Sequence, residues 1–211
     1  MLYNLSDLLQ TGAELTGVDT KTGAGKKRGG AIASFNIVDF DMARAVIAAA
    51  EELQRPVIVG IAVRHWDKID APALSRAVHA LCVNSAAPTA LHLDHTPPER
   101  IEVLKEAVDL GFTSVMIDGS KEPFERNVGV TREAVEYAHT RGVSVEAELG
   151  AIEGTEGEAD AVSGSSDESL FTDPDTAAEF IRKTNADALA VSVGTAHGVY
   201  TSAPEIKFDL I

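Results

Sequence analysis

The feature that most constrains the fold is a repeated pattern in which a short apolar, β-branched run is followed by a loop and an amphipathic helical stretch. The apolar runs do not alternate with polar residues, as expected of parallel strands that are covered on both faces. The pattern therefore predicts a series of βα units. The predicted strands lie near residues 31–37, 56–62, 89–93, 114–118, 143–148 and 187–193.

Several of the intervening helices have recognisable ends. Asp39 and Asp173 stand where a side chain can cap a helix, and a proline that suits the first helical position follows Asp173. Thr96 is predicted to cap a further helix, with Glu99 completing a capping box. Gly111 is predicted to end that helix. Each helix should then pack its apolar stripe against the sheet.

Six βα repeats fit either a doubly wound sheet or most of a TIM (β/α)₈ barrel, and the pattern alone does not choose between these α/β folds. The predicted strand starts are spaced by about 25 to 44 residues, so two further units would need roughly 60 to 75 residues beyond Ile211. If the fold is a barrel, residues 1–211 form a single domain in which about six units are present and the last two are missing.

Two segments stand outside the βα pattern. Residues 16–30 hold a Gly and Lys cluster, but Gly25-Lys26 is followed by Lys27 and has no Gly five residues before it, which excludes a P-loop. We expect a flexible surface loop there. Residues 151–172 are acidic and rich in Gly and Ser, which is typical of an active-site lid and equally of a solvated insertion.

Charge and composition exclude several classes of partner. Asp and Glu outnumber Lys and Arg by 33 to 18, a net charge of −15 that argues against nucleic acids and anionic membrane surfaces. No apolar run approaches the ~20 residues that span a bilayer. The first residues do not read as a secretory signal, so a cytoplasmic location is expected. Cys82 falls in step with apolar helix positions, which predicts a buried structural thiol.

Three of the predicted strands carry ionisable side chains at their carboxyl ends. In parallel α/β sheets this is the edge where active sites lie. Because burying such groups without partners is costly, they should be paired, bound to metal or exposed in a shared cleft. The groups are His92, Asp94 and His95 in the third strand, Glu146 and Glu148 in the fifth, and His197 after the sixth.

His95 and His197, which follow strands far apart in the sequence, are the best candidate metal ligands, because neutral imidazoles suit zinc. Nearby carboxylates can orient such ligands or act as acid and base. Strand alternation sends His92 and Asp94 to one face and His95 to the other, unless the chain has already turned into its loop. Glu148 is nearer its strand end than Glu146 and is the better candidate of the two.

Five short motifs follow one another in order along the chain. They are Ser34-Phe35-Asn36, LHLDH at 91–95, MIDGS at 116–120 with Pro123-Phe124 and Asn127 after it, VEAELG at 145–150, and GTAHGVY at 194–200. With these motifs the sequence resembles the class II, metal-dependent ketose-bisphosphate aldolases, which include the fructose- and tagatose-bisphosphate enzymes. The resemblance implies a TIM barrel.

The resemblance also implies roles for individual residues. Zinc would be held by three His, of which two are His95 and His197, with Glu148 near the metal as an alternate ligand. Asp94 would exchange a proton with the C4 hydroxyl of the substrate. Glu156, in the predicted lid, would remove a proton from dihydroxyacetone phosphate.

Other implied positions lie around the substrate. Gly198 matches part of a site for phosphate and for a monovalent cation (Na⁺ or K⁺), and Asn36 matches a supporting Asn of the active site. The family's third zinc His and its Gly and Ser-rich phosphate loop would lie beyond Ile211. Gly60 and Ala62 stand where many relatives carry a polar residue and a phosphate-binding Ser or Thr.

The resemblance thus implies a glycolysis-related lyase that uses zinc to cleave a phosphorylated ketose, similar to fructose- or tagatose-1,6-bisphosphate, reversibly to dihydroxyacetone phosphate and an aldehyde. Zinc can stabilise the negative charge left by the cleavage, so no lysine Schiff base is needed. Family likeness suggests a homodimer or homotetramer. The alternatives are a noncatalytic barrel that serves as a scaffold or ligand-binding subunit, and a zinc hydrolase, which Asn36 disfavours because such enzymes usually begin with H-x-H.

Overall fold

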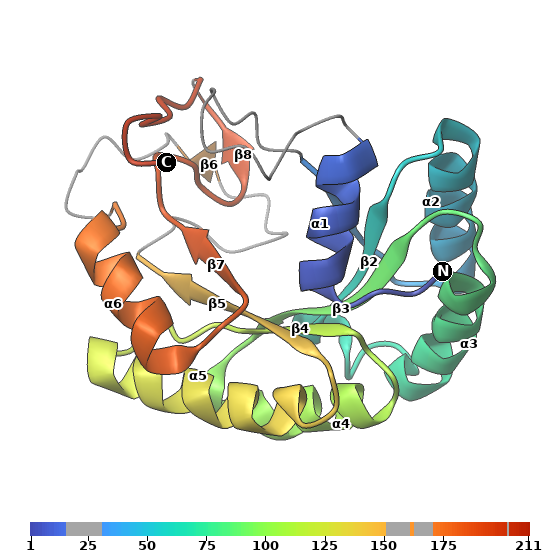
Figure 1. Ribbon diagram of the computed structural model, residues 1–211, viewed down its shortest axis with the longest axis horizontal. Coiled ribbons are helices and arrows are strands. Elements are labelled where there is room, and N and C mark those ends of the chain that lie inside the picture. The colour runs from blue at the N-terminus through green and yellow to red at the C-terminus, as the bar shows by residue number, and fades with distance from the viewer. Residues whose placement is uncertain (16–30, 151–160, 163–170, 202) are drawn as a thin grey trace.

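The computed structural model describes residues 1–15, 31–150, 161–162, 171–201 and 203–211 (Figure 1). Its main element is a six-stranded sheet in the order β1-β2-β3-β4-β5-β7, in which every neighbouring pair is parallel. The strands are β1 (Ala33–Asn36), β2 (Val57–Ala62), β3 (Thr89–Thr96), β4 (Ser114–Ile117), β5 (Ser144–Leu149) and β7 (Ala188–Val191). All six predicted strands are therefore confirmed.

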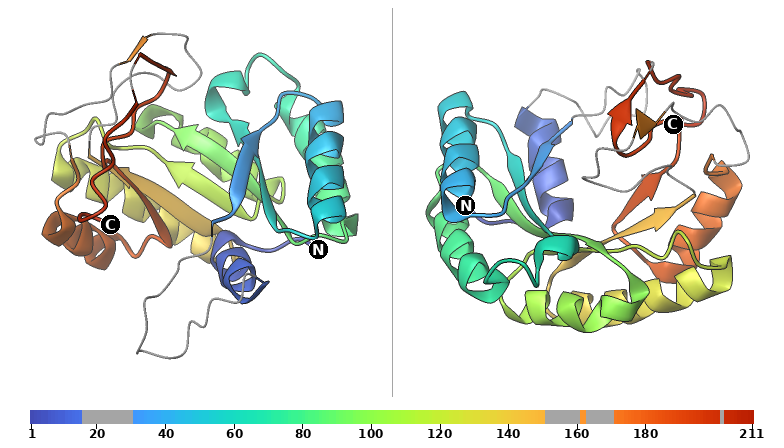
Figure 2. Two further views of the ribbon diagram at one scale, coloured as in Figure 1. Left: turned by 90° about the horizontal axis from the view of Figure 1, so that it is seen from above. Right: turned by 180° about the vertical axis from the view of Figure 1, so that it is seen from behind.

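Helices cover the convex side of this sheet, which curls in cross-section (Figure 2). They are α2 (Phe40–Leu53), α3 (Ala71–Asn84), α4 (Ile101–Asp109), α5 (Phe124–His139) and α6 (Pro174–Thr184). Helix α1 (Leu5–Leu15) is not part of this layer and lies near the amino ends of the strands, where the Ser6 amide donates to Ser144 Oγ at the start of β5 (Figure 2, left). A small parallel pair, β6 (Ala161–Val162) and β8 (Val199–Tyr200), lies beyond the sheet.

The strand order decides between the two predicted folds. In a doubly wound sheet the order reverses at a switch point and helices cover both faces, whereas here the order follows the chain and the outer helices lie on one side. The described residues form a curled half-barrel with alternating strands and helices, a partial TIM barrel. This confirms the barrel prediction.

The helix ends confirm most of the predicted signals. Asp39 Oδ1 accepts a hydrogen bond from the Met42 amide at 2.8 Å, and Asp173 Oδ1 accepts one from the Thr176 amide at 2.8 Å. Gly111, with φ +94°, follows the end of α4.

The prediction that Thr96 caps a helix is wrong. Thr96 is the last residue of β3 and is fully buried, and its carbonyl accepts a hydrogen bond from the Asp118 amide at 2.8 Å, because the pairing with the β4 side continues to this point. A 3₁₀ turn, Pro98–Arg100, then leads into α4 without a side-chain cap.

The core lies between the sheet and its outer helices. Leu91, Val115 and Val145 of the central strands are fully buried, and Phe112 and Phe180 fill the largest volumes against them. Cys82 is also fully buried, and burial raises the pKa of its thiol to about 11, which confirms the structural interpretation.

Two further observations bear on the sequence predictions. Within the described chain, no helix has both the length and the apolar character needed to cross a membrane. The predicted loop at 16–30, and the predicted lid at 151–172 apart from residues 161–162 and 171–172, lie outside the described residues.

Candidate active site

The ionisable side chains gather at the carboxyl ends of the strands, as the parallel arrangement requires. Asn36 ends β1, Asp94 and His95 lie near the end of β3, Asp118 follows β4 and Glu148 lies near the end of β5. The segment after β7 brings His197 to the same edge, where its ring meets that of His95.

A β-bulge in β3 decides which way His95 points. The register with β4 pairs Leu93 with Val115 but Thr96 with Ile117, so β3 has one residue more than its neighbour. His95 adopts φ +52°, a left-handed conformation that is uncommon for a non-glycine residue and often occurs at functional sites. Alternation across a regular strand would separate His95 from Asp94. The bulge instead brings His95 Nδ1 within 2.9 Å of Asp94 Oδ1.

Asp94 is held by partners on both carboxylate oxygens. Asn36 Nδ2 donates to Oδ2 at 2.7 Å, while Oδ1 contacts His95 Nδ1 and lies 3.8 Å from His92 Nε2. Burial by itself would raise the pKa of Asp94, but the contacts with His92 and His95 outweigh it and lower the pKa below its ordinary value. Asp94 is therefore set up as an ionised carboxylate.

The ionised state of Asp94 also selects a tautomer for His95. An ionised carboxylate only accepts hydrogen bonds, so Nδ1 is the protonated nitrogen of a neutral His95 ring and Nε2 carries the lone pair. Nε2 lies 3.7 Å from Glu148 Oε2. A carboxylate that orients an imidazole in this way is the usual second partner of a metal-binding His.

Below Asp94 lies a polar cavity of about 350 Å³ on the concave side of the sheet. His92 lines this cavity: its Nδ1 lies 2.8 Å from Ser114 Oγ, and its Nε2 lies 3.7 Å from Glu146 Oε2. Asp94, whose carboxylate can accept a proton, forms part of the cavity wall. The cavity is lined by Leu5, Ser34, Asn36, Ile58, His92, Asp94 and Glu146.

Three further donors converge next to Asp94. One ligand atom each from His95, Asp118 and Glu148 lie within 4.8 Å of one another. Glu148 is only 4% exposed, and its Oε2 has no hydrogen-bond partner among the residues that the structure describes. Burial, followed by the nearby Asp118 carboxylate, raises the pKa of Glu148 to about 7. A divalent cation bound here would satisfy the orphaned oxygen, so this donor set fits a metal.

Asp118 is the site residue that the sequence analysis missed. Its Oδ1 accepts hydrogen bonds from the Ser120 amide at 3.0 Å and from Ser120 Oγ at 2.7 Å, as in an ordinary turn. The available signal was its position as the last residue of the predicted strand at 114–118, within the MIDGS motif.

The predicted pair of imidazoles comes together. The rings of His95 and His197 have centroids 5.3 Å apart and are nearly perpendicular, at 88°. Burial, and then the neighbouring His95, lower the pKa of His197, which favours the neutral form that binds metals. Gly198 follows with φ +106°, exposed at the edge of the site, whereas Glu156 lies outside the described residues.

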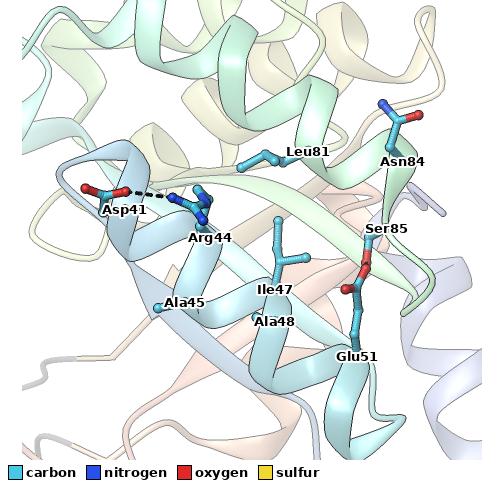
Figure 3. A pocket seen from close by; sticks show the side chains of 9 residues that line it. All are labelled: Asp41, Arg44, Ala45, Ile47, Ala48, Glu51, Leu81, Asn84 and Ser85. Carbon is cyan, nitrogen blue, oxygen red and sulfur yellow. Dashed lines mark hydrogen bonds and ion pairs between the residues drawn. The ribbon is translucent and has the colours of Figure 1, made fainter.

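A larger hollow, of about 500 Å³, lies on the outer surface between α2 and α3 (Figure 3). Its charged side chains already have partners. Arg44 pairs with Asp41 at 3.3 Å, and Glu51 Oε1 accepts hydrogen bonds from Ser85 Oγ at 2.9 Å and from the Ala86 amide at 2.8 Å. We therefore place the candidate site at the carboxyl ends of the strands, where acid–base and metal-binding groups meet.

Comparisons with known sequences indicate to which protein family the chain is similar. A family model described as class-II fructose-bisphosphate aldolase matches residues 20–211. The chain is 40% identical over 188 residues to a fructose-bisphosphate aldolase of Staphylococcus aureus, covering 87% of this chain and 63% of that protein. It is 42% identical over 183 residues to one of Geobacillus stearothermophilus, covering 84% and 61%. The chain thus spans less than two thirds of the length of these relatives.

Solved structures with a similar fold agree. The YdjI aldolase from Escherichia coli K12 superposes with a TM-score of 0.78 at 32% identity, covering 100% of this chain and 67% of that one. A fructose-bisphosphate aldolase from Campylobacter jejuni has a TM-score of 0.73 at 24% identity, covering 99% and 62%, a likeness of fold alone.

Proposed function

The chain belongs to the class II fructose-bisphosphate aldolase family, and on this basis we propose that it acts as a zinc-dependent aldolase. The reaction would cleave a phosphorylated ketose reversibly to dihydroxyacetone phosphate and an aldehyde. The observation that carries the proposal is an ionised Asp94 beside the donor cluster of His95, Asp118 and Glu148. A group that accepts a proton and a place for a Lewis acid are thereby adjacent.

We assign the metal to His95, His197 and Glu148. Imidazole nitrogens and carboxylate oxygens are donors that zinc accepts in proteins. The orphaned Oε2 of Glu148 and the lone pair on His95 Nε2 both support this assignment. When bound, zinc would supply Lewis-acid stabilisation of negative charge on substrate oxygens.

We assign proton transfer at the C4 hydroxyl of the substrate to Asp94. Asn36 and His95 fix its two oxygens and His92 helps keep it ionised, so Asp94 is ready to accept the hydroxyl proton during cleavage and to return it during synthesis. A positioned acid–base group of this kind contributes on the order of 10²- to 10⁴-fold in rate.

The remaining assignments follow from family membership. Glu156 would act as the base for dihydroxyacetone phosphate, and Gly198 would contribute to the phosphate and monovalent-cation site. The partner is a small phosphorylated sugar. A homodimer or homotetramer stays a prediction.

The test is metal removal and restoration on this chain. Fructose- and tagatose-1,6-bisphosphate are supplied, and triose phosphate release is followed with a coupled NADH assay. We expect activity to disappear with a chelator and to return with zinc. Activity that survives complete zinc removal would contradict the proposal, and stoichiometric zinc without turnover of any ketose phosphate would support the noncatalytic scaffold instead.

A matched pair of His variants locates the metal. His197→Ala should lose zinc, because it removes the imidazole beside His95. His139→Ala should keep zinc, because His139 ends α5 at the opposite end of the sheet and pairs with Asp187 at 2.9 Å. Equal zinc content in the two variants would refute the assignment of His197.

A further inference from the structure

The hydrogen bond between Asn36 and Asp94 joins two strands that are not neighbours. Asn36 ends β1 and Asp94 lies on β3, with β2 between them. In the register of the sheet, Asn36 pairs with Gly60, and Asp94 pairs with Ala62. Adjacent strands are about 4.8 Å apart, so the Asn36 side chain must pass over β2 to bring its Nδ2 within 2.7 Å of Asp94 Oδ2.

Gly60 is the residue over which this side chain passes. A Cβ atom added to Gly60 would overlap Asn36 Oδ1 and would lie 3.4 Å from Asn36 Cγ. The next nearest atom, the Phe35 carbonyl oxygen, would be 3.6 Å away, an ordinary contact. The obstacle to a side chain at position 60 is therefore the Asn36 amide.

The backbone gives no other reason for glycine at this position. Gly60 lies inside a regular strand and is not among the glycines with positive φ. A glycine within a strand weakens it and often marks a close approach by another group. The approaching group here is the side chain that holds Asp94.

We propose that Gly60 is a positioning residue, whose missing side chain leaves the passage through which Asn36 reaches and orients Asp94. The inference deepens the proposed function and rests on it, because the orientation of Asp94 matters for catalysis only if Asp94 exchanges the substrate proton. With Asn36 on Oδ2 and His95 on Oδ1, the plane of the carboxylate is set. A misplacement of about 1 Å in such a group can cost 10²-fold in rate.

The kinetic test compares Gly60→Ala with Asn36→Ala and with the double variant. Gly60→Ala should lower kcat about 10- to 100-fold, with little change in KM and unchanged zinc content, since the metal donors are untouched. Asn36→Ala should lower kcat similarly. The double variant should be no slower than Asn36→Ala alone, because the added methyl group then fills the space that the amide has left.

Gly129→Ala is the matched control. Gly129 is an exposed residue of α5 where an added Cβ would meet nothing within 4 Å, so its kcat should not change. An unchanged kcat in Gly60→Ala, a loss of zinc from it, or multiplied losses in the double variant would each overturn the proposal.

A stability cycle separates this inference from the proposed function. In metal-free protein, Gly60→Ala should lower the urea midpoint when Asn36 is present and should leave it unchanged or raise it in the Asn36→Ala background. This coupling is measured without any turnover, so it tests the passage even if the wild-type chain proves not to be an aldolase. Equal midpoint shifts in the two backgrounds would refute the passage.

Discussion

Two carboxylates flank His95, one partly buried and one almost fully buried, and they behave in opposite ways. Asp94, on β3, has partners on both oxygens, and the pKa of its carboxyl is lowered. Glu148, on β5, has an oxygen without a hydrogen-bond partner in the described part of the chain, and the pKa of its carboxyl is raised to about 7. Burial acts in the same direction on both, so the neighbours decide the ionisation. The protein contacts of Asp94 keep its carboxylate ionised, whereas Glu148 needs a bound cation to favour its ionised form.

Each carboxylate is supported by an asparagine, but at a different atom. Asn36 binds the side chain of Asp94 directly. Asn127, which is 1% exposed on α5, donates from Nδ2 to the main-chain carbonyl of Glu148 at 2.9 Å. On β3, Asn36 thus fixes the carboxylate of Asp94. On β5, Asn127 fixes only the backbone of Glu148 and leaves its carboxylate available for an ion.

The largest expected effect is on kcat and comes from replacing Asp94, the ionised carboxylate on β3. Asp94→Asn keeps the shape of the side chain but removes the proton acceptor, so kcat should fall on the order of 10²- to 10⁴-fold. Zinc content, measured by atomic emission, should fall less than in His197→Ala, because Asp94 orients His95 but is not itself an assigned ligand. A variant that turns over at the wild-type rate would remove Asp94 from the proton-transfer role.

The second prediction concerns the β5 side in metal-free protein. Because the folded-state pKa of Glu148 is raised from 4.5 to about 7, its protonated form contributes stability that is fully present below pH 4.5 and is lost as the pH rises through 7. The size is on the order of 3 kcal/mol. Urea unfolding with a chelator present should show this decline in wild type and not in Glu148→Gln. Parallel curves for the two proteins would contradict it.

The third prediction tests the backbone support of Glu148. Asn127→Ala leaves a buried carbonyl without its donor, which should lower the free energy of unfolding by about 1–3 kcal/mol. The matched control is Asn84→Ala, since Asn84 is exposed on α3 and should cost within ~0.5 kcal/mol. Chemical denaturation of the pair measures the difference, and equal losses would show that Asn127 has no special role.

The smallest expected effect is on stability and comes from replacing Ser114, the partner of His92 on β3. Ser114→Ala removes the partner of His92 Nδ1 at 2.8 Å, which should cost about 0.5–1.5 kcal/mol of stability. The kcat of this variant should change less than that of Asp94→Asn, because Asn36 and His95 still hold Asp94. If kcat instead fell as far as in Asp94→Asn, His92 would control the position of the Asp94 carboxylate more strongly than Asn36 and His95 do.

Much of the fold was predictable, because apolar runs and helix caps are local signals. The strands and the caps at Asp39 and Asp173 follow from residues that are neighbours in the sequence. The meeting of His95 and His197 could also be expected, since the ends of parallel strands share one edge.

The rest depended on how the strands pair. Regular alternation would send His95 to the face opposite Asp94, and the extra residue in β3 that keeps the two side chains together is visible only against the register of β4. The Pro and Glu after Thr96 are typical of a helix start and so predict a cap at Thr96, although the strand pairing continues through this residue. Asp118 is the last residue of a predicted strand, and its closeness to His95 and Glu148 in the structure marks it as a candidate ligand.

The extra residue in β3 has a consequence for anyone who rebuilds this site elsewhere. A regular strand directs consecutive side chains to opposite faces, so copying Asp94 and His95 onto a regular strand of another barrel would separate the two side chains. A design that copies Asp94 and His95 must therefore also copy the β-bulge. Conversely, a deletion that restored regular pairing between Leu93 and Thr96 would have to remove Asp94 or His95, because no other residue lies between them, so the bulge cannot be removed without losing one member of the pair.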